Sequence, residues 1–315
     1  MDQRKALFME HFQAPSVAKP YLEAMFSPEE IRLGAVMEPS KPFSKESVAE
    51  VLGEGCDLDR FITDAYRHGV ISYTDDTMTS FQLGNFYESL DIFAISRQEE
   101  FRDLPEEGQK AMADWAFDTF YNRLNPDPAV RPGADVILPL DQVLDFIEER
   151  RNKPVYLNHC DCKSLNGACG KPTHVCITYN DGINTYVHRG LSQKMTAEEA
   201  KQVVMDADRA GLMHTVNGET ICNCCDDCCY LFRSQERRHS AGFWPRTENI
   251  ISWNGAKCVH CGLCTRRCMF HVFAKPGDRI AVDTSHCVGC GICATACPKG
   301  ALSLIPRETG EVPAQ

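Results

Sequence analysis

Cysteine is the residue type that gives this chain of 315 residues most of its chemistry, since 18 cysteines are present. Eight of them form the same CxxCxxCxxxC run written twice, as Cys258, Cys261, Cys264 and Cys268 and then as Cys287, Cys290, Cys293 and Cys297. Three thiolates spaced by two residues can bind three corners of a cubane 4Fe–4S cluster from one tight loop, and the fourth corner then needs a ligand from elsewhere. The two runs therefore predict two clusters and one-electron chemistry.

Zinc is the alternative occupant of these runs, because CxxC pairs also bind zinc. A zinc ribbon does not require two tandem four-cysteine runs, each with a glycine directly after its second cysteine, as Gly262 and Gly291 are here. The spacing favours iron–sulfur clusters over zinc.

Residues 250–306 resemble the bacterial-type two-cluster ferredoxin domain. The second run, CVGCGICATACPKGAL, fits that family closely, whereas the first, KCVHCGLCTRRCMFHVF, has Met269 in place of the expected proline and His260 beside its second cysteine. In this family the last cysteine of each run ligates the other cluster. The resemblance thus implies one cluster held by Cys258, Cys261, Cys264 and Cys297, and a second held by Cys287, Cys290, Cys293 and Cys268.

Nine further cysteines lie in the middle of the chain in two groups. The first group is Cys160, Cys162, Cys169 and Cys176, and the second is Cys222, Cys224, Cys225, Cys228 and Cys229. Each group follows a strand candidate, at residues 154–159 and 212–221. If these strands run parallel in one sheet, their carboxyl ends share an edge, and up to nine thiols meet there.

Nine thiols suffice for two clusters, for one cluster with a zinc, or for an unusual cluster. We favour at least one further iron–sulfur cluster, with structural zinc as the alternative and a dithiol at Cys225 and Cys228 as a minor one. Neighbouring sulfurs such as those of Cys224 and Cys225 do not easily share one cubane, so the pair is expected to serve different centres.

Some polar residues close to these cysteines could ligate, orient or carry protons. They are His159, His174, His214 and Asp161. Each on its own is expected to be a satisfied polar residue near a metal site, and no catalytic residue is assigned.

The middle region, residues 134–240, is predicted to be a cysteine-rich α/β domain. Residues 139–151 and 196–211 have helical patterns, the second with Thr196 and Glu199 as a capping box. Residues 175–188 are predicted to form a hairpin that turns at residues 180–182.

The N-terminal region, residues 1–130, is predicted to be mainly helical. Residues 26–37, 44–53 and 57–69 have helical spacing, with Ser44 and Asp57 as N-caps, and residues 70–86 follow as a hairpin. This order is that of a winged-helix unit at about residues 27–90. Cys56 within it is expected to be an ordinary thiol.

Charge argues against DNA as the partner of that unit. The whole chain has a net charge of −11, with −15 over residues 1–150 and +4 over residues 151–315. Residues 27–90 have a net charge of −7, and DNA affinity requires basic side chains that neutralise phosphates.

The sequence thus predicts a multidomain α+β protein of three parts: a mainly helical region, a cysteine-rich α/β domain and a C-terminal ferredoxin-like domain. We expect an electron-transfer protein or the electron-transfer subunit of an anaerobic oxidoreductase that receives electrons from a redox partner, because GxGxxG and Walker sequences are absent. The alternatives are a reductase with a substrate-binding iron–sulfur centre in the middle domain and a redox-sensing winged-helix regulator. Exposed clusters, no signal peptide and no long apolar run favour a reducing cytoplasm without membrane insertion.

Overall fold

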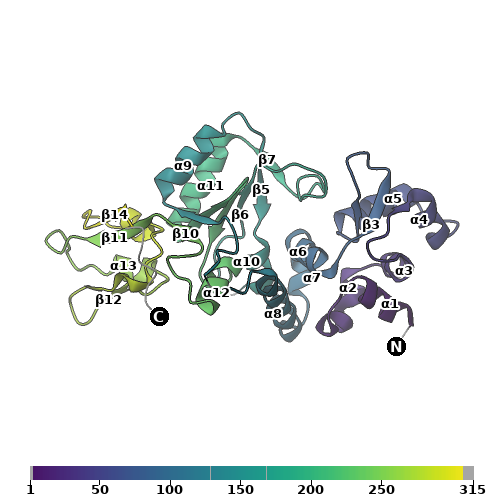
Figure 1. Cartoon of the computed structure of the whole chain (residues 1–315), viewed down its shortest axis with the longest axis horizontal. Coiled ribbons are helices and arrows are strands. Elements are labelled where there is room, and N and C mark those ends of the chain that lie inside the picture. Colours follow the sequence, from purple (N-terminus) through teal and green to yellow (C-terminus); the bar gives the residue numbers. More distant parts are fainter. Residues whose placement is uncertain (1–2, 128, 168, 308–315) are drawn as a thin grey trace. The chain divides into compact units, whose positions relative to one another are not determined.

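A computed structural model describes residues 3–127, 129–167 and 169–307 of the chain (Figure 1). Its contacts divide the chain into two compact units. The first comprises residues 1–120, 164–166 and 180–193, and the second comprises residues 121–163, 167–179 and 194–315. The second unit therefore contains the predicted ferredoxin domain and most of the predicted cysteine-rich domain, of which residues 164–166 and 180–193 belong to the first unit.

The first unit is mainly helical, as the sequence predicted. Its helices are α1 (Gln3–His11), η1 (Ser16–Tyr21), α2 (Leu22–Met25), α3 (Pro28–Val36), α4 (Lys45–Leu52), α5 (Leu58–Arg67), α6 (Phe86–Ser96), α7 (Gln98–Arg102) and most of α8 (Glu106–Arg123). The strands β1 (Phe43–Ser44), β2 (Ile71–Tyr73) and β3 (Ser80–Leu83) form an antiparallel sheet in the order β1-β3-β2.

Local signals determine where these helices begin. The side chain of Ser44 accepts a hydrogen bond from the Ser47 N–H at the start of α4, and Asp57 accepts one from Arg60 N–H at the start of α5. Each cap satisfies one of the backbone donors that a helix leaves unpaired. The three predicted helices, their caps and the hairpin β2–β3 are therefore confirmed.

The predicted hairpin over residues 175–188 is wrong. Only its first half forms a strand, β6 (His174–Thr178), and both edges of β6 are already paired, with β5 (Val155–His159) and with β9 (Thr220–Cys224). Residues 180–192 form turns instead and belong to the first unit.

Two side chains attach this segment to the first unit. The Asn184 amide accepts from Tyr73 N–H and donates to Tyr73 C=O, both at 2.9 Å, as a paired strand would. Arg189 is 2% exposed and donates to the backbone carbonyl of Ile71 (3.1 Å), to Ser72 (2.8 Å) and to the Glu88 carboxylate (2.8 Å). These charge-assisted hydrogen bonds of a buried guanidinium hold the segment on the first unit.

The second unit is built on a seven-stranded sheet in the order β10-β4-β8-β9-β6-β5-β7. Its other strands are β4 (Val136–Leu138), β7 (Gln193–Met195), β8 (Met213–Asn217) and β10 (Arg246–Thr247). Its helices are α9 (Leu140–Glu149), α10 (Asp161–Asn166), which extends into residues of the first unit, α11 (Ala197–Arg209) and α12 (Tyr230–Arg237). The predicted helices α9 and α11 are confirmed, α11 with the Thr196–Glu199 capping box.

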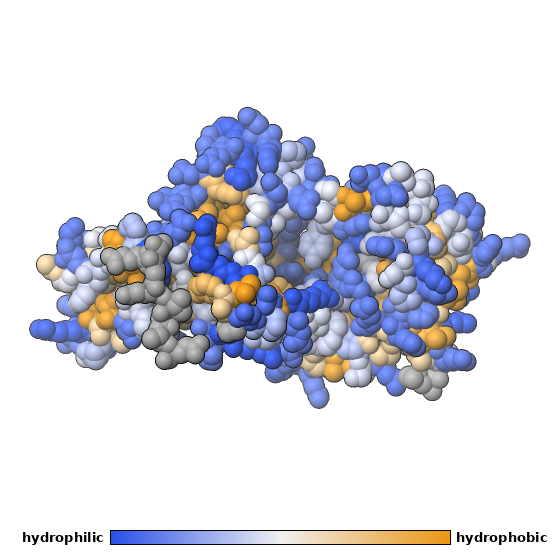
Figure 2. Space-filling view, viewed as in Figure 1, coloured by the Kyte–Doolittle hydropathy of each residue, from blue (hydrophilic) through white to orange (hydrophobic). Residues whose placement is uncertain are grey.

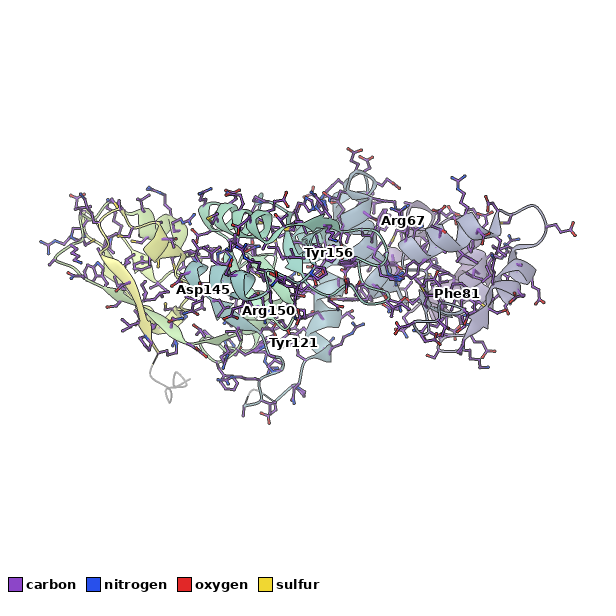
Figure 3. All side chains as sticks on the ribbon, turned by 90° about the horizontal axis from the view of Figure 1, so that it is seen from above. Arg67, Phe81, Tyr121, Asp145, Arg150 and Tyr156 are labelled. Carbon is purple, nitrogen blue, oxygen red and sulfur yellow. The ribbon has the colours of Figure 1, made fainter. Side chains whose placement is uncertain are left out.

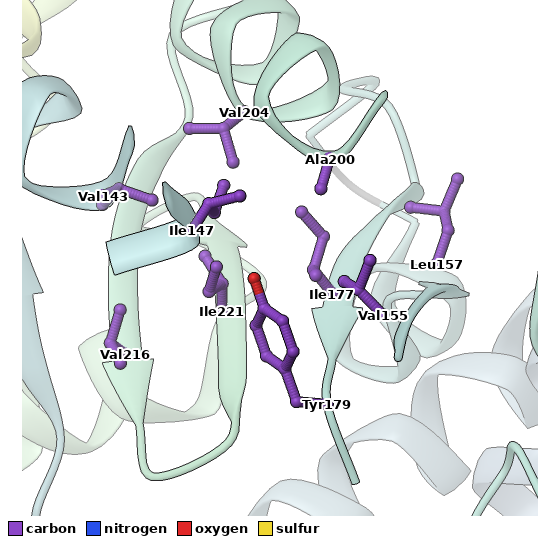
Figure 4. Packing of buried hydrophobic residues seen from close by; sticks show 10 residues of the cluster. All are labelled: Val143, Ile147, Val155, Leu157, Ile177, Tyr179, Ala200, Val204, Val216 and Ile221. Carbon is purple, nitrogen blue, oxygen red and sulfur yellow. The ribbon is translucent and has the colours of Figure 1, made fainter. Parts of the chain in front are cut away.

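Helices α9 and α11 lie side by side over one face of this sheet (Figure 1). Their apolar side chains pack on those of β5, β6, β8 and β9 (Figure 4). The buried residues of this core are Val143, Ile147, Val155, Leu157, Ile177, Tyr179, Ala200, Val204, Val216 and Ile221. Arg150, labelled in Figure 3, caps the C-terminus of α9. Its guanidinium lies 3.5 Å from the centroid of the Phe146 ring, and this cation–π contact stabilises the end of the helix.

Residues 212–221, predicted as one strand candidate, are part of a hairpin of two strands, β8 and β9, that turns at Gly218 with φ +56°. The cysteines Cys222 and Cys224 lie within β9. Because β5 and β9 are both antiparallel to β6, they are parallel to each other. The carboxyl ends of β5 and β9 therefore lie at the same edge of the sheet. The strand that leads to the second cysteine group is β9, and not the one that begins at residue 213, β8.

The C-terminal part of this unit has small paired strands around two short helices. Strands β11 (Asn249–Trp253) and β14 (Leu302–Pro306) pair antiparallel, as do β12 (Phe273–Ala274) and β13 (Ala281–Val282). The helices are α13 (Leu263–Arg267), η2 (Thr284–His286) and α14 (Ile292–Thr295).

Hydrophilic residues predominate on the face seen in Figure 2, and the hydrophobic ones form small separate groups. Among the described residues, none of the helices is long and apolar enough to cross a membrane.

We predict that Arg189→Ala destabilises the first unit by about 3 kcal/mol, because it leaves Ser72 and a backbone carbonyl without their buried donor and Glu88 without its cation. Chemical denaturation followed by circular dichroism measures this. Arg60→Ala is the matched control, because the Arg60–Asp64 ion pair is exposed and 3.7 Å long, and its loss costs about 0.5 kcal/mol or less. Equal effects of the two substitutions would contradict this role of Arg189.

Candidate metal centres

The C-terminal cysteines line two separate pockets. The first pocket is lined by Cys258, Cys261, Cys264 and Cys297, and the second by Cys268, Cys287, Cys290 and Cys293. The remaining lining residues are almost all apolar or glycine. Each pocket thus combines three cysteines of one run with the last cysteine of the other, which is the grouping that the resemblance implied.

The two pockets differ in exposure. In the first, Cys261 is exposed and Val259 is 56% exposed, whereas in the second Cys287 and Cys293 are buried. Solvent therefore reaches the first pocket more readily.

The backbone repeats as the sequence does. His260 and Gly289 occupy equivalent places and have φ of +53° and +67°, and Gly262 and Gly291 have φ of +78° and +79°. Left-handed backbone favours glycine, and a non-glycine residue there needs support. His260 has such support, since its Nδ1 accepts from Ile280 N–H at 3.0 Å. The first run, with His260 at this position, thus keeps the backbone geometry that the second run has at Gly289.

Met269 also keeps a defined place. It lines the second pocket, and its Sδ accepts a hydrogen bond from Lys171 Nζ at 3.2 Å. Its side chain also packs against the apolar cluster that contains Cys225 and Cys228. Met269, which stands where a proline was expected, therefore contacts both the second pocket and the apolar cluster of the middle cysteines.

Burial and backbone hydrogen bonds act differently on the sulfurs of the two pockets. Burial raises the pKa of Cys290 to about 12 and raises that of Cys293 as well. Burial alone would also raise the pKa of Cys297, but N–H groups of residues 299–302 lower it. Burial also raises the pKa of Cys264 in the first pocket and that of Cys268 in the second. Buried thiols of this kind become thiolates when a bound metal displaces their protons.

Six of the nine middle cysteines form a ring of thiols. Around the ring, Cys162 contacts Cys160, Cys160 contacts Cys176, Cys176 contacts Cys222, Cys222 contacts Cys224, and Cys224 contacts Cys229. Cys229 in turn interacts electrostatically with Cys160 and Cys162, which closes the ring.

Strand geometry explains how these sulfurs meet. Side chains alternate between the two faces of a strand. Ile177 and Ile221 point to the face covered by α9 and α11, so their neighbours Cys176 and Cys222 point to the opposite face, as does Cys224. The carboxyl end of β5 brings Cys160 to the same edge, because β5 is antiparallel to β6.

Hydrogen bonds divide the protons unevenly within the ring. Those from Cys160 and Cys222 lower the pKa of Cys176, and those from Cys222 and Cys229 lower that of Cys224. The same contacts raise the pKa values of Cys222 and Cys229. Any thiolate formed in the ring needs a positive charge beside it, because an uncompensated buried charge is costly.

Lys163 supplies part of that compensation. Its side chain is 1% exposed, and its Nζ donates to the Asn223 carbonyl at 2.6 Å. Burial alone would lower the pKa of Lys163, but the charges of Cys160, Cys176, Cys224 and Cys225 raise it above its ordinary value. Sequence analysis missed Lys163, although a lysine directly after a CxC motif was a usable signal.

The other three middle cysteines gather separately. The sulfurs of Cys169, Cys225 and Cys228 and a carboxylate oxygen of Asp227 all lie within 4.8 Å of one another. The sulfurs of the neighbours Cys224 and Cys225 thus lie in different groups, and so do those of Cys228 and Cys229. Asp227 was also missed by sequence analysis.

Of the polar residues predicted near the cysteines, Asp161 groups with cysteine sulfurs, and the three histidines have other contacts. The rings of His159 and His174 stack at 4.1 Å between centroids. His214 is fully buried, with its Nδ1 2.6 Å from Asn223 Oδ1 and its Nε2 4.0 Å from Asp208 Oδ1. Asp161 lies beside Cys160 and Cys162, and burial raises its pKa to about 6.

An apolar core joins the middle sheet to the second C-terminal pocket. Val288 and Ile292 from that pocket pack with Cys224, Cys229 and Phe232. Arg267 adds polar contacts, since it donates to the backbone carbonyls of Asp208 and Arg209 at the end of α11. A cation at a helix C-terminus is stabilising, so the two parts are held together by both kinds of contact.

Comparison with known proteins gives one match. Residues 280–303 match the family model of the 4Fe-4S binding domain, and this segment contains Cys287, Cys290, Cys293 and Cys297. No curated protein and no solved structure matches the chain. The chain therefore contains a 4Fe–4S binding domain, which implies iron–sulfur electron transfer.

We predict that Gly289→Ala abolishes metal binding at the second pocket, because the new Cβ would lie 2.0 Å from the Asn249 carbonyl oxygen. Gly300→Ala is the matched control: its φ is also positive, at +57°, but nothing lies within 4 Å of the new Cβ, so it costs only about 1 kcal/mol. Iron content per chain and thermal unfolding measure the difference. Normal iron content in Gly289→Ala would contradict the prediction.

Proposed function

We propose that this protein is an iron–sulfur electron-transfer protein or the electron-transfer subunit of an anaerobic oxidoreductase. The observation that carries the proposal is the pair of four-cysteine pockets, the second of which takes three of its four cysteines from the matched 4Fe–4S segment. Four thiols that converge in an apolar pocket fit the ligand requirement of a cubane cluster.

We assign one cluster to each pocket with the ligands that line it. Cys258, Cys261, Cys264 and Cys297 hold the first, and Cys268, Cys287, Cys290 and Cys293 hold the second. Clusters held there supply one-electron transfer. The apolar side chains that line the pockets exclude water from the clusters. Backbone N–H groups stabilise negative charge on the sulfurs by hydrogen bonds, such as that from Ala301 N–H to Cys297 Sγ at 3.3 Å.

The unequal exposure of the two pockets supports an order of electron transfer between them. A redox partner docks at the more exposed first pocket, near Val259 and Trp253, which is 37% exposed. The second pocket adjoins the middle cysteines through Val288 and Ile292. The second pocket is thus the link between the partner and the interior of the unit.

The six-thiol ring is assigned to a further metal centre. Its thiols exceed the four that a single cubane needs, and Lys163 provides a fixed positive charge beside them. We favour iron–sulfur chemistry over zinc here because the ring adjoins the second pocket directly. Iron, sulfide and zinc analysis of protein purified without oxygen distinguishes the two.

The first unit is proposed to contain a winged-helix module in residues 27–90. Helices α3, α4 and α5 and the sheet β1-β3-β2 follow the order of that fold. Its net charge of −7 suits docking to a protein better than binding to phosphates.

We predict that Cys290→Ser removes about four irons per chain, the content of one cubane, and one of the reduced 4Fe–4S signals in electron paramagnetic resonance (EPR). Cys56→Ser is the matched control, because Cys56 is a half-exposed thiol of the first unit, and it leaves both readouts unchanged. An iron content unchanged by Cys290→Ser, or zinc in equal amount, would refute a cluster in the second pocket.

We predict that the protein does not retard duplex DNA in a gel-shift assay at low salt, where electrostatic binding is strongest. Retardation would instead favour the redox-sensing regulator. In that case the acidic residues of 27–90 would have to lie away from the DNA.

A further inference from the structure

The middle cysteines outside the ring gather in one small group with an aspartate. The sulfurs of Cys169, Cys225 and Cys228 and a carboxylate oxygen of Asp227 all lie within 4.8 Å of one another. The three sulfurs contact one another in all three pairs. Within the described ranges, no three sulfurs of either C-terminal pocket come this close. The group therefore differs in geometry from the pockets that we assign to clusters.

The spacing of these four atoms is that of ligands around a single metal ion. Zinc binds thiolate sulfur at about 2.3 Å and carboxylate oxygen at about 2.1 Å, so its tetrahedral ligands lie about 4 Å apart. The terminal ligands of a 4Fe–4S cubane stand more than about 6 Å apart, because each of them binds a different iron. The four ligand atoms therefore fit one ion and do not fit a cubane.

The surroundings of the group suit an enclosed ion. Cys225 and Cys228 are fully buried in an apolar cluster with Val175, Ala207 and Leu212. The third cysteine of the group is partly buried against the same cluster. The aspartate, in contrast, is exposed. The three sulfurs thus supply ligands from the interior, and the carboxylate supplies the ligand on the solvent side.

Backbone N–H groups favour the thiolate form of two of these sulfurs. Burial raises the pKa of Cys169, and the contact with Cys228 raises that of Cys225. The N–H of Lys171 donates to the first of these sulfurs and the N–H of Cys228 to the second, and each hydrogen bond lowers the pKa of its sulfur. Donors of this kind stabilise the charge of a metal-bound thiolate and orient it.

We propose that Cys169, Cys225, Cys228 and Asp227 bind one zinc ion, as a structural site that takes no part in electron transfer. Zinc accepts thiolate and carboxylate ligands in a tetrahedron, has no redox chemistry and binds such sites more tightly than Fe²⁺ does. Four protein ligands leave no open position, which is typical of structural zinc. The site goes beyond the proposed function and does not depend on it.

The zinc ion fixes the turn that carries two sulfurs of the ring. Cys225 and Cys228 stand at the ends of a four-residue turn that follows β9. Their outer neighbours Cys224 and Cys229 belong to the ring and contact each other. An ion that joins the inner pair closes the turn, and it therefore holds the outer pair together on the other side.

The test is metal analysis of the full-length protein purified without oxygen, with zinc K-edge X-ray absorption on the same samples. We expect about one zinc per chain, bound by three sulfurs and one oxygen. Cys228→Ser loses this zinc. Asp227→Cys keeps it, with a fourth sulfur in place of the oxygen, whereas the matched control Asp226→Cys keeps the native spectrum.

Absence of zinc from the native protein would overturn the proposal, and so would a zinc spectrum that Asp227→Cys leaves unchanged. Zinc that is lost on Cys162→Ser but kept on Cys228→Ser would also overturn it, because the ion would then belong to the ring. Iron content and the reduced EPR spectrum of the same samples report on the C-terminal pockets. Normal 4Fe–4S signals without zinc refute only this site, and zinc without 4Fe–4S signals refutes only the proposed function.

Discussion

A buried thiolate needs positive charge in contact with it, and the second unit is organised around that need. Burial raises the pKa values of Cys290 and Cys293, and the ring sulfurs lie in a similarly enclosed place. Lys163 is one fixed cation among them, but one ammonium group does not balance six thiols. Because a thiol becomes a ligand by losing its proton to solvent as the metal binds, the cores of this unit are expected to form fully only when metal is present.

The second constraint is the two-residue period of the β-strand. It places Ile177 and Ile221 under α9 and α11 and their neighbours Cys176 and Cys222 on the other face. One sheet therefore supplies both an ordinary aliphatic core and a face lined with thiols. A shift of one residue in the register of β9 would exchange these roles, so the aliphatic core also determines which cysteines meet.

Much of this arrangement could be predicted from sequence where the signal is local. Ligand spacing predicted a 4Fe–4S binding segment, which the match of residues 280–303 confirms, and caps such as Ser44 and Thr196 marked helix starts. The predicted hairpin over residues 175–188 failed because its outcome depends on distant partners: β6 is paired on both edges, and Arg189 is held by Ser72 and Glu88. Lys163 and Asp227 were missed for a similar reason, since their importance arises only once the fold brings distant cysteines beside them.

The unequal exposure of the two C-terminal pockets also sets an order of damage. Dissolved oxygen meets Cys261 at the surface before it reaches the buried Cys287 and Cys293. With clusters held as proposed, air would first disconnect the molecule from its partner and leave the inner centres intact. Brief exposure to air would then leave a protein whose inner centres are intact but cannot exchange electrons with the partner. Rebuilding the cluster of the first pocket would restore electron transfer.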